Sequence, residues 1–218
     1  MSKLIVKDLH HTYNDGDSET KVLRGVNATF ESGKLYAIMG ESGSGKTTLI
    51  SLIAALDNIM QGDILFDDVS IKKIGNQKFR LSYVNIVFQS YNLIKYMNAR
   101  ENVEVAIDFS NFKGNTKEYA YDLLGGVGIS KSEADRPILK LSGGEQQRVA
   151  IARSMATNEP IMVADEPTGN LDEENEEKIM SIFKQLANDG RIVIIVTHSK
   201  NVAKYADVIY KIKKGVIN

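Results

Sequence analysis

The glycine-rich stretch Gly40–Thr48 constrains the fold of this 218-residue chain more than any other feature. It reads GESGSGKTT and matches the pattern G-x-x-x-x-G-K-[ST]. The apolar segment KLYAIMG leads into it, and the segment after it has apolar residues at a helical spacing, namely Leu49, Leu52, Ile53 and Leu56. This order predicts a buried strand, a tight loop and a helix. It is typical of α/β domains in which the loop binds a phosphate group at the helix N-terminus.

The residue types of the loop fit different parts of a nucleotide. Gly43 and Gly45 allow the backbone to curl, so that successive N–H groups surround a phosphate. We expect Lys46 to reach the β- and γ-phosphate oxygens, the Thr47 hydroxyl to bind Mg²⁺ and Thr48 to bind the α-phosphate. The alternative is a glycine-rich turn with an exposed lysine. The loop residues that we expect to contact a nucleotide are Gly40, Ser42, Gly43, Ser44, Gly45, Lys46, Thr47 and Thr48.

The pattern of the remaining chain predicts an α/β fold. Alternating segments near the N-terminus, joined by the polar stretch NDGDSET, indicate an antiparallel hairpin. Residues 91–156 are more polar and helical, and we interpret them as an inserted helical subdomain. The C-terminal part returns to strands and helices in alternation: IMVADE, a helix over 173–188, RIVIIVTH, a short helix and ADVIYKIKKG. Such alternation favours a mostly parallel sheet covered on both faces. We expect residues 1–218 to form a single domain that contains this subdomain.

Composition excludes several classes of function. The chain has no cysteine, which excludes disulfides, thiolate metal sites and cysteine nucleophiles. Its formal net charge of -1 gives no sign of a nucleic-acid partner. The N-terminus does not have the pattern of a signal peptide, and no run approaches the roughly 20 apolar residues that cross a bilayer. We therefore expect any membrane role to depend on a partner.

Two adjacent carboxylates follow the apolar segment IMVA. Asp165 is expected at the carboxyl end of a strand, the edge of a parallel sheet where ligands bind, and is placed to hold Mg²⁺. Side chains alternate along a strand, so Glu166 cannot repeat this role. It is better placed to orient or deprotonate an attacking water molecule. The alternative is a solvated acidic pair that ends a strand.

The stretch LSGGEQQRVAIARSMA, from Leu141 to Ala156, begins with polar residues and two glycines and continues as a helix. Glycine inside a helix costs roughly 0.5–1 kcal/mol relative to alanine. We interpret the glycines as bare backbone at a second anion site. One γ-phosphate does not need two such sites from one chain, but it can use both if the second belongs to another copy.

LSGGEQQ resembles the signature motif of ABC-transporter ATPases, and other motifs of that family follow in order over essentially the whole chain. The resemblance implies a P-loop NTPase (RecA-like) core with an N-terminal antiparallel β subdomain. It further implies that ATP is bound with Mg²⁺ by these motifs and by a second chain packed head to tail, whose Ser142, Gly143, Gly144 and Glu145 contact the nucleotide. By the same resemblance, Tyr13 would stack on adenine and Asp172 of the D-loop would contact the nucleotide. Gln89 of the Q-loop would bind Mg²⁺ together with Thr47 and Asp165. The catalytic residues would be Glu166 and His198.

The longer matches LSGGEQQRVAIAR and ADEPTGNLD are similar to the lipoprotein-release and macrolide-export group (LolD and MacB type), with FtsE and bacitracin-type resistance ATPases as relatives. This resemblance implies a subunit at the cytoplasmic face of the cell membrane. Its partner would be an integral membrane permease, with or without an extracytoplasmic adaptor, for export or extraction of lipids, peptides or drugs. A regulatory ATPase that signals without transport is the alternative. Two other classes of protein fit this sequence less well. Soluble family members that act on DNA carry long insertions, and those that act on ribosomes carry a second cassette, neither of which this sequence has. A phosphotransferase would need an acceptor site, and no motif in this sequence indicates one.

Several further side chains have simpler interpretations. His10 and His11 lack metal-ligand spacing and are expected to be structural. Arg148 and Arg153 lie on the signature helix, where we expect ion pairs. The segment SYNLIKYMNARENV departs from relatives at Lys95, Tyr96 and Met97. It carries apolar residues that we expect to form a partly exposed permease-docking surface, with subdomain core as the alternative: Tyr91, Leu93, Ile94, Tyr96 and Met97.

Overall fold

A computed structural model of the chain describes residues 1–14, 16, 19–110, 112–169 and 171–217. Its strands are β1 (Lys3–Asn14), β2 (Glu19–Glu31), β3 (Lys34–Met39), β4 (Gln61–Phe66), β5 (Val69–Ser70), β6 (Val84–Val87), β7 (Ile161–Asp165), β8 (Ile192–Thr197), β9 (Val208–Lys213) and β10 (Val216–Ile217). Its helices are α1 (Lys46–Ile53), α2 (Ile71–Ile74), α3 (Asn76–Tyr83), α4 (Ala99–Asp108), α5 (Thr116–Gly126), α6 (Lys131–Ala134), α7 (Gly143–Met155), α8 (Glu173–Asn188) and α9 (Lys200–Ala203), with a 3₁₀ turn at Ile138–Lys140.

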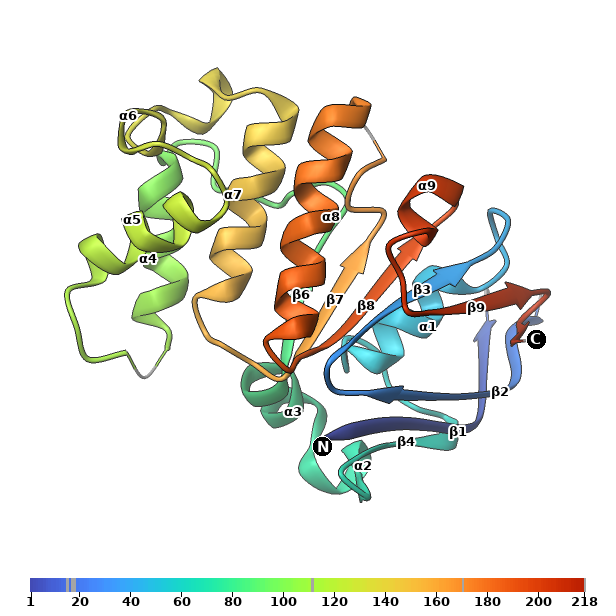
Figure 1. The fold of residues 1–218 in the computed structure, drawn as a ribbon. Coiled ribbons are helices and arrows are strands. Elements are labelled where there is room, and N and C mark those ends of the chain that lie inside the picture. Colours follow the sequence, from blue (N-terminus) through green and yellow to red (C-terminus); the bar gives the residue numbers. More distant parts are fainter. Residues whose placement is uncertain (15, 17–18, 111, 170, 218) are drawn as a thin grey trace.

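The strands form two sheets (Figure 1). One is antiparallel, in the order β2-β1-β4-β5. The other has the order β10-β9-β3-β8-β7-β6, and its strands run parallel except for β10, which pairs antiparallel with β9. The expected α/β architecture, with an antiparallel part near the N-terminus and a helical insert, is confirmed.

The central strands of the parallel sheet are covered on both faces, and their residues 35–38, 161–164 and 192–196 are apolar and buried. Val193 and Ile195 of β8 join a core cluster with helices α4, α5, α7 and α8, whereas Ile192, Ile194 and Val196 join a cluster with α1 and the antiparallel sheet. In Figure 1, α7 and α8 cover one face of the sheet, and α1 lies between the two sheets. This packing fixes the sheet on which the site is built.

The register of the parallel strands brings their carboxyl ends to one edge. Met39 of β3 pairs with Thr197 of β8, and Asp165 of β7 pairs with Val196. The residues that follow these strands, from Gly40, Glu166 and His198 onward, therefore start from the same edge. This is the edge at which open α/β sheets bind ligands.

The stretch predicted to be helical contains α4 to α7, and in Figure 1 α4, α5 and α6 lie on the side of α7 away from the sheets. The boundaries 91–156 of a subdomain stay a prediction. The helix after the glycine loop is shorter than expected: α1 ends at Ile53, and Leu56 lies beyond it with 44% of its surface exposed. None of the helices in the described part of the chain has the length and apolar character needed to span a bilayer.

Candidate nucleotide site

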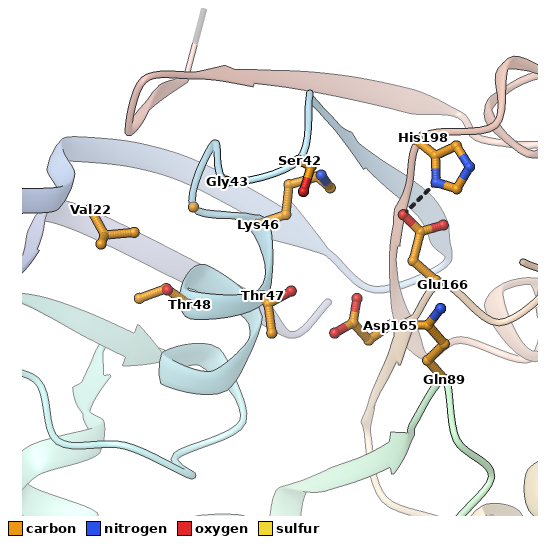
Figure 2. Close-up of a pocket in the computed structure, with 11 residues that line it drawn as sticks. Val22, Ser42, Gly43, Lys46, Thr47, Thr48, Gln89, Asp165, Glu166 and His198 are labelled. Atoms are coloured by element: carbon orange, nitrogen blue, oxygen red, sulfur yellow. Dashed lines mark hydrogen bonds and ion pairs between the residues drawn. The ribbon is translucent and has the colours of Figure 1, made fainter. Parts of the chain in front are cut away.

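A cavity of about 750 Å³ lies at the carboxyl edge of the parallel sheet (Figure 2). The loop after β3, the end of β7 and the end of β8 all contribute to it, as does the residue two positions beyond β6. Its lining residues are Val22, Ser42, Gly43, Gly45, Lys46, Thr47, Thr48, Gln89, Asp165, Glu166 and His198. The structure thus brings together most of the residues that the sequence indicated in separate motifs.

The glycine loop is curled around the lysine that ends it. Gly43 and Gly45 have φ angles of 74° and 104°, in the left-handed region that glycine adopts without strain. Lys46 is the first residue of α1, and its Nζ donates hydrogen bonds to the carbonyl oxygens of Gly40 and Glu41, both at 2.9 Å. The ammonium group is therefore held over the loop, where it can meet an anion next to the N-terminus of α1.

Ser44 supplies an independent sign that the loop fits a polar ligand. Its hydroxyl oxygen is buried and has no hydrogen-bond partner among the described residues. Unsatisfied buried polar groups are uncommon and call for a partner. A phosphate oxygen would supply one.

Asp165 faces the glycine loop at the end of β7. Figure 2 shows its carboxylate and the Thr47 hydroxyl pointing toward one another across the cavity floor. Burial raises the pKa of Asp165, with the adjacent Thr47 hydroxyl acting in the opposite direction. A carboxylate in this position is stabilised by a nearby cation. With Gln89, these side chains offer the oxygen ligands that Mg²⁺ prefers.

Glu166 points away from Asp165 and pairs with His198. Its Oε1 accepts a hydrogen bond from Nδ1 of His198 at 2.8 Å (Figure 2). The backbone of Glu166 has left β7 in a left-handed conformation, with a φ of 44°, and its N–H donates to the carbonyl of Val196. Such a conformation is strained for a residue other than glycine and is often found at functional sites. The two carboxylates diverge as expected, by a sharp turn rather than by strand alternation.

Two further residues come from the antiparallel sheet, of which Val22 lines the cavity and Tyr13 does not. Tyr13, on β1, places its hydroxyl 3.5 Å from the Thr48 hydroxyl, and its exposed ring packs edge-to-face on His11. Val22, on β2, lines the cavity but was not among the residues expected from sequence. No local pattern marks it, because its position depends on how the antiparallel sheet docks against the glycine loop.

The signature residues do not line the cavity of their own chain. Ser142 caps α7 by accepting a hydrogen bond from the Glu145 N–H, and the Glu145 carboxylate accepts one from the Ser142 N–H. Asp172 caps α8 in a similar way. The pair of glycines is not explained by one cause: Gly143 is exposed, whereas Gly144 is buried against the side chain of Asn175.

The expectation of ion pairs at Arg148 and Arg153 is wrong. In the described part of the chain neither guanidinium lies within salt-bridge distance of a carboxylate. Arg148 donates to the side-chain oxygen of Asn175 at 3.0 Å. Arg153 donates to the carbonyl oxygens of Tyr91 and Asn92, and burial lowers the pKa of Arg153. Both arginines thus bond to neutral oxygens of segments distant in the sequence, where the expectation had carboxylates. No local sequence pattern indicates which segments these arginines meet.

The two N-terminal histidines each lie close to an aspartate. His10 Nε2 lies 3.0 Å from Asp8, and His11 is buried with Nε2 3.5 Å from Asp57.

The apolar segment after Gln89 divides between exposed and packed positions. Tyr96 is 88% exposed, Leu93 packs against the helical core cluster, and the remaining three are partly buried: Tyr91, Ile94 and Met97.

Comparison with known proteins identifies relatives over nearly the whole chain. Residues 23–169 match the family model of the ABC transporter. The chain is 45% identical over 192 residues to the ABC transporter ATP-binding protein YclH of Bacillus subtilis, covering 87% of this chain and 85% of that protein. It is 40% identical over 213 residues to the macrolide export ATP-binding/permease protein MacB of Chlorobium luteolum, covering 96% of this chain. The chain spans 32% of the length of that MacB.

Solved structures agree with this comparison. A dimeric structure of MJ0796, a bacterial ABC transporter cassette, has a TM-score of 0.89 and 36% identity, covering 99% of this chain and 96% of that one. A second dimeric structure of MJ0796, in a post-hydrolysis state bound to ADP and Pi, has a TM-score of 0.90 and 35% identity over the same shares.

Proposed function

Because the chain belongs to the ABC transporter family of ATP-binding cassettes and is an ABC ATPase, we propose that it hydrolyses ATP to power a membrane permease. The observation that carries this proposal is the convergence of Lys46, Asp165, Glu166 and His198 on one cavity. A cation for phosphate, a carboxylate for a metal ion and a carboxylate–histidine pair for water are the groups that phosphate hydrolysis needs.

The glycine loop is proposed to bind the phosphates of ATP, with Tyr13 stacking on adenine. Backbone N–H groups between Ser42 and Lys46 would surround the β-phosphate, and Lys46 would reach the γ-phosphate. The buried Ser44 hydroxyl supports this fit, because it has no partner among the described residues. Thr48, whose hydroxyl lies near that of Tyr13, would contact the α-phosphate.

Thr47, Gln89 and Asp165 are proposed to hold Mg²⁺, directly or through water. Their side chains supply oxygens at one side of the cavity, and the partly buried Asp165 carboxylate favours a cation beside it. Bound there, Mg²⁺ would neutralise charge on the phosphate oxygens.

Glu166 is proposed to accept a proton from the attacking water. His198 would orient Glu166 through the bond at 2.8 Å and would contact the γ-phosphate with its exposed side. Removal of such a base typically lowers a rate by about 10²–10⁴-fold. Glu166→Gln keeps the size of the side chain and removes its charge, so it is the matched variant for this role.

We propose that two copies enclose two ATP molecules, with the signature of each copy facing the glycine loop of the other. Ser142 and Gly143 are exposed at the N-terminus of α7, where N–H groups and the positive end of the helix can meet a γ-phosphate. Gly144, Glu145 and Asp172 would complete the contact. Hydrogen bonds to charged groups contribute about 1.5–3 kcal/mol each, so a few per site can hold a dimer only while ATP is bound. The dimeric structures of MJ0796 support the pairing of two copies.

The partner is proposed to be an integral membrane permease, with or without an extracytoplasmic adaptor, and the subunit would lie at the cytoplasmic face of the membrane. The similarity to MacB, named as one ATP-binding/permease protein, supports export or extraction of lipids, peptides or drugs. The exposed Tyr96 and its neighbours in residues 91–97 would form the docking surface.

The experiment compares ATP hydrolysis by the unaltered protein and by Glu166→Gln, each with Mg²⁺. We expect hydrolysis by the former and a rate lowered by about 10²–10⁴-fold in the latter, with ATP binding retained. Equal rates would refute the role of Glu166. The tagged variant, added with ATP to solubilised membranes of the source organism, should retain a multispanning permease. Substrate movement in vesicles reconstituted with that permease would separate transport from a regulatory role.

A further inference from the structure

The loop after Gln89 is built around two strained residues. Tyr91 and Asn92 have φ angles of 59° and 50°, so two successive residues other than glycine adopt the left-handed conformation. The turn is closed by hydrogen bonds from the Tyr91 N–H to the Phe88 carbonyl and from the Asn92 N–H to the Ser90 carbonyl. Conformations of this kind persist only where surrounding contacts hold them.

The contact that holds this turn comes from the signature helix. Arg153, near the C-terminal end of α7, donates through one guanidinium nitrogen to the Asn92 carbonyl at 2.6 Å and through the other to the Tyr91 carbonyl at 2.9 Å. A guanidinium has donors in a rigid planar fork, which suits two neighbouring carbonyls, whereas a lysine presents a single flexible point. The side chain is half-buried and has no carboxylate partner among the described residues.

Tyr91 also comes close to the start of the same helix, ten residues before Arg153. A Cβ built on Gly143 would lie 3.4 Å from the hydroxyl oxygen of Tyr91 and within 4 Å of no other group among its described neighbours. Long side chains on a helix lean toward its N-terminus, so Arg153 reaches back along α7 to the carbonyl of Tyr91 while the ring of Tyr91 continues to Gly143. Residues 143 and 153 are about 15 Å apart along α7 at 1.5 Å per residue, and the Arg153 side chain and Tyr91 together cover this distance.

From this geometry we propose that Arg153 is a positioning residue that clamps the Gln89 loop to the signature helix, so that the two move as one body. The proposal rests on the proposed function, in which Gln89 serves the ATP site of its own chain and Ser142 and Gly143 serve that of the partner. The clamp would convert a shift of Gln89 on ATP binding into a shift of the signature, and would so couple the two sites.

The test uses Arg153→Met, which keeps an unbranched apolar stem and removes both donors. Its matched control is Arg100→Met, since Arg100 bonds Glu104 and Asp135 within the helical insert. In the nucleotide-free protein, amide hydrogen exchange of residues 89–93 should be about tenfold faster in Arg153→Met and unchanged in the control. Unchanged exchange in Arg153→Met would overturn the clamp.

The functional readouts separate coupling from a merely structural role. In Arg153→Met, which loses two hydrogen bonds from a charged group, kcat and the ATP-dependent dimerisation measured with Glu166→Gln should each fall by at least about tenfold, with KM and monomer ATP affinity nearly unchanged. Arg153→Lys, which retains a single donor nitrogen, should recover part of kcat, and it replaces the Met variant if that variant does not fold. Wild-type kcat and dimerisation, or an equal loss of ATP affinity, would overturn the proposal. Failure of Glu166→Gln alone to dimerise would count against the proposed function, while hydrogen exchange still decides the clamp.

Discussion

The two adjacent glycines of the signature should respond differently to the same substitution. A Cβ on Gly144 would lie 2.8 Å from Cγ and 2.9 Å from Oδ1 of Asn175. Asn175 is held in place, because its Oδ1 accepts from Arg148 and its Nδ2 donates to Asp172. Within the described part of the chain, a Cβ on Gly143 would meet only the Tyr91 hydroxyl, at 3.4 Å. Gly144→Ala therefore strains the fold, and Gly143→Ala does not.

The size of the difference follows from two opposing effects. Overpacking costs about 1–3 kcal/mol, whereas replacing glycine by alanine in a helix contributes about 0.5–1 kcal/mol of stability. For Gly144→Ala the net loss is about 0–2.5 kcal/mol, which lowers Tm by up to about 10 °C in a chain of this length. For Gly143→Ala the helix preference alone remains, so Tm should rise by about 1–4 °C.

Thermal unfolding of both variants without nucleotide measures this difference. ATP hydrolysis should fall in both, and Gly143→Ala should lose activity without losing stability, because its added methyl would stand where the partner's γ-phosphate is proposed to bind. A Gly143→Ala variant less stable than Gly144→Ala, or equal Tm values for the two, would refute the packing argument. Wild-type activity in Gly143→Ala would refute the proposed phosphate contact.

Gly215 lies with a φ of 79° where a Cβ would be 2.2 Å from the Val22 carbonyl, and its N–H donates to the Ser44 carbonyl. Gly215→Ala should destabilise the protein by about 2–5 kcal/mol and weaken ATP binding, as measured by chemical denaturation and calorimetric titration; unchanged stability would contradict this close packing. Asp165→Asn should raise the Mg²⁺ concentration for half-maximal hydrolysis by about 10–100-fold. A Mg²⁺ titration that matches the unaltered protein would remove Asp165 from the metal site. Chelation of Mg²⁺ should stop hydrolysis in the unaltered protein, and hydrolysis that continues in the chelator would contradict the metal requirement.

Local patterns were enough to predict where the main elements of the site lie. The glycines and lysine of residues 40–48 specify a turn and a helix start whatever surrounds them, and the structure has both. The apolar runs before Asp165 and His198 predict buried parallel strands, and parallel strands place their carboxyl ends together. The clustering of these residues therefore follows from local sequence and one topological rule.

Contacts between distant segments could not be predicted in this way. The pairing of Arg153 with backbone carbonyls depends on the left-handed turn at Tyr91 and Asn92, whose residue types do not require it. The packing of Gly144 depends on where the start of α8 meets α7. In both cases, the conformation is set by tertiary contacts that override local preference.

The central claim is that ATP joins two copies of this chain through the glycine loop of one and the signature of the other. The most direct test is the mass in solution of Glu166→Gln, measured by light scattering with ATP, with ADP and without nucleotide. The account predicts twice the chain mass with ATP, the chain mass in the other two conditions, and loss of the ATP-dependent dimer when Gly143→Ala is added. A protein that binds ATP and keeps the mass of one chain would contradict it.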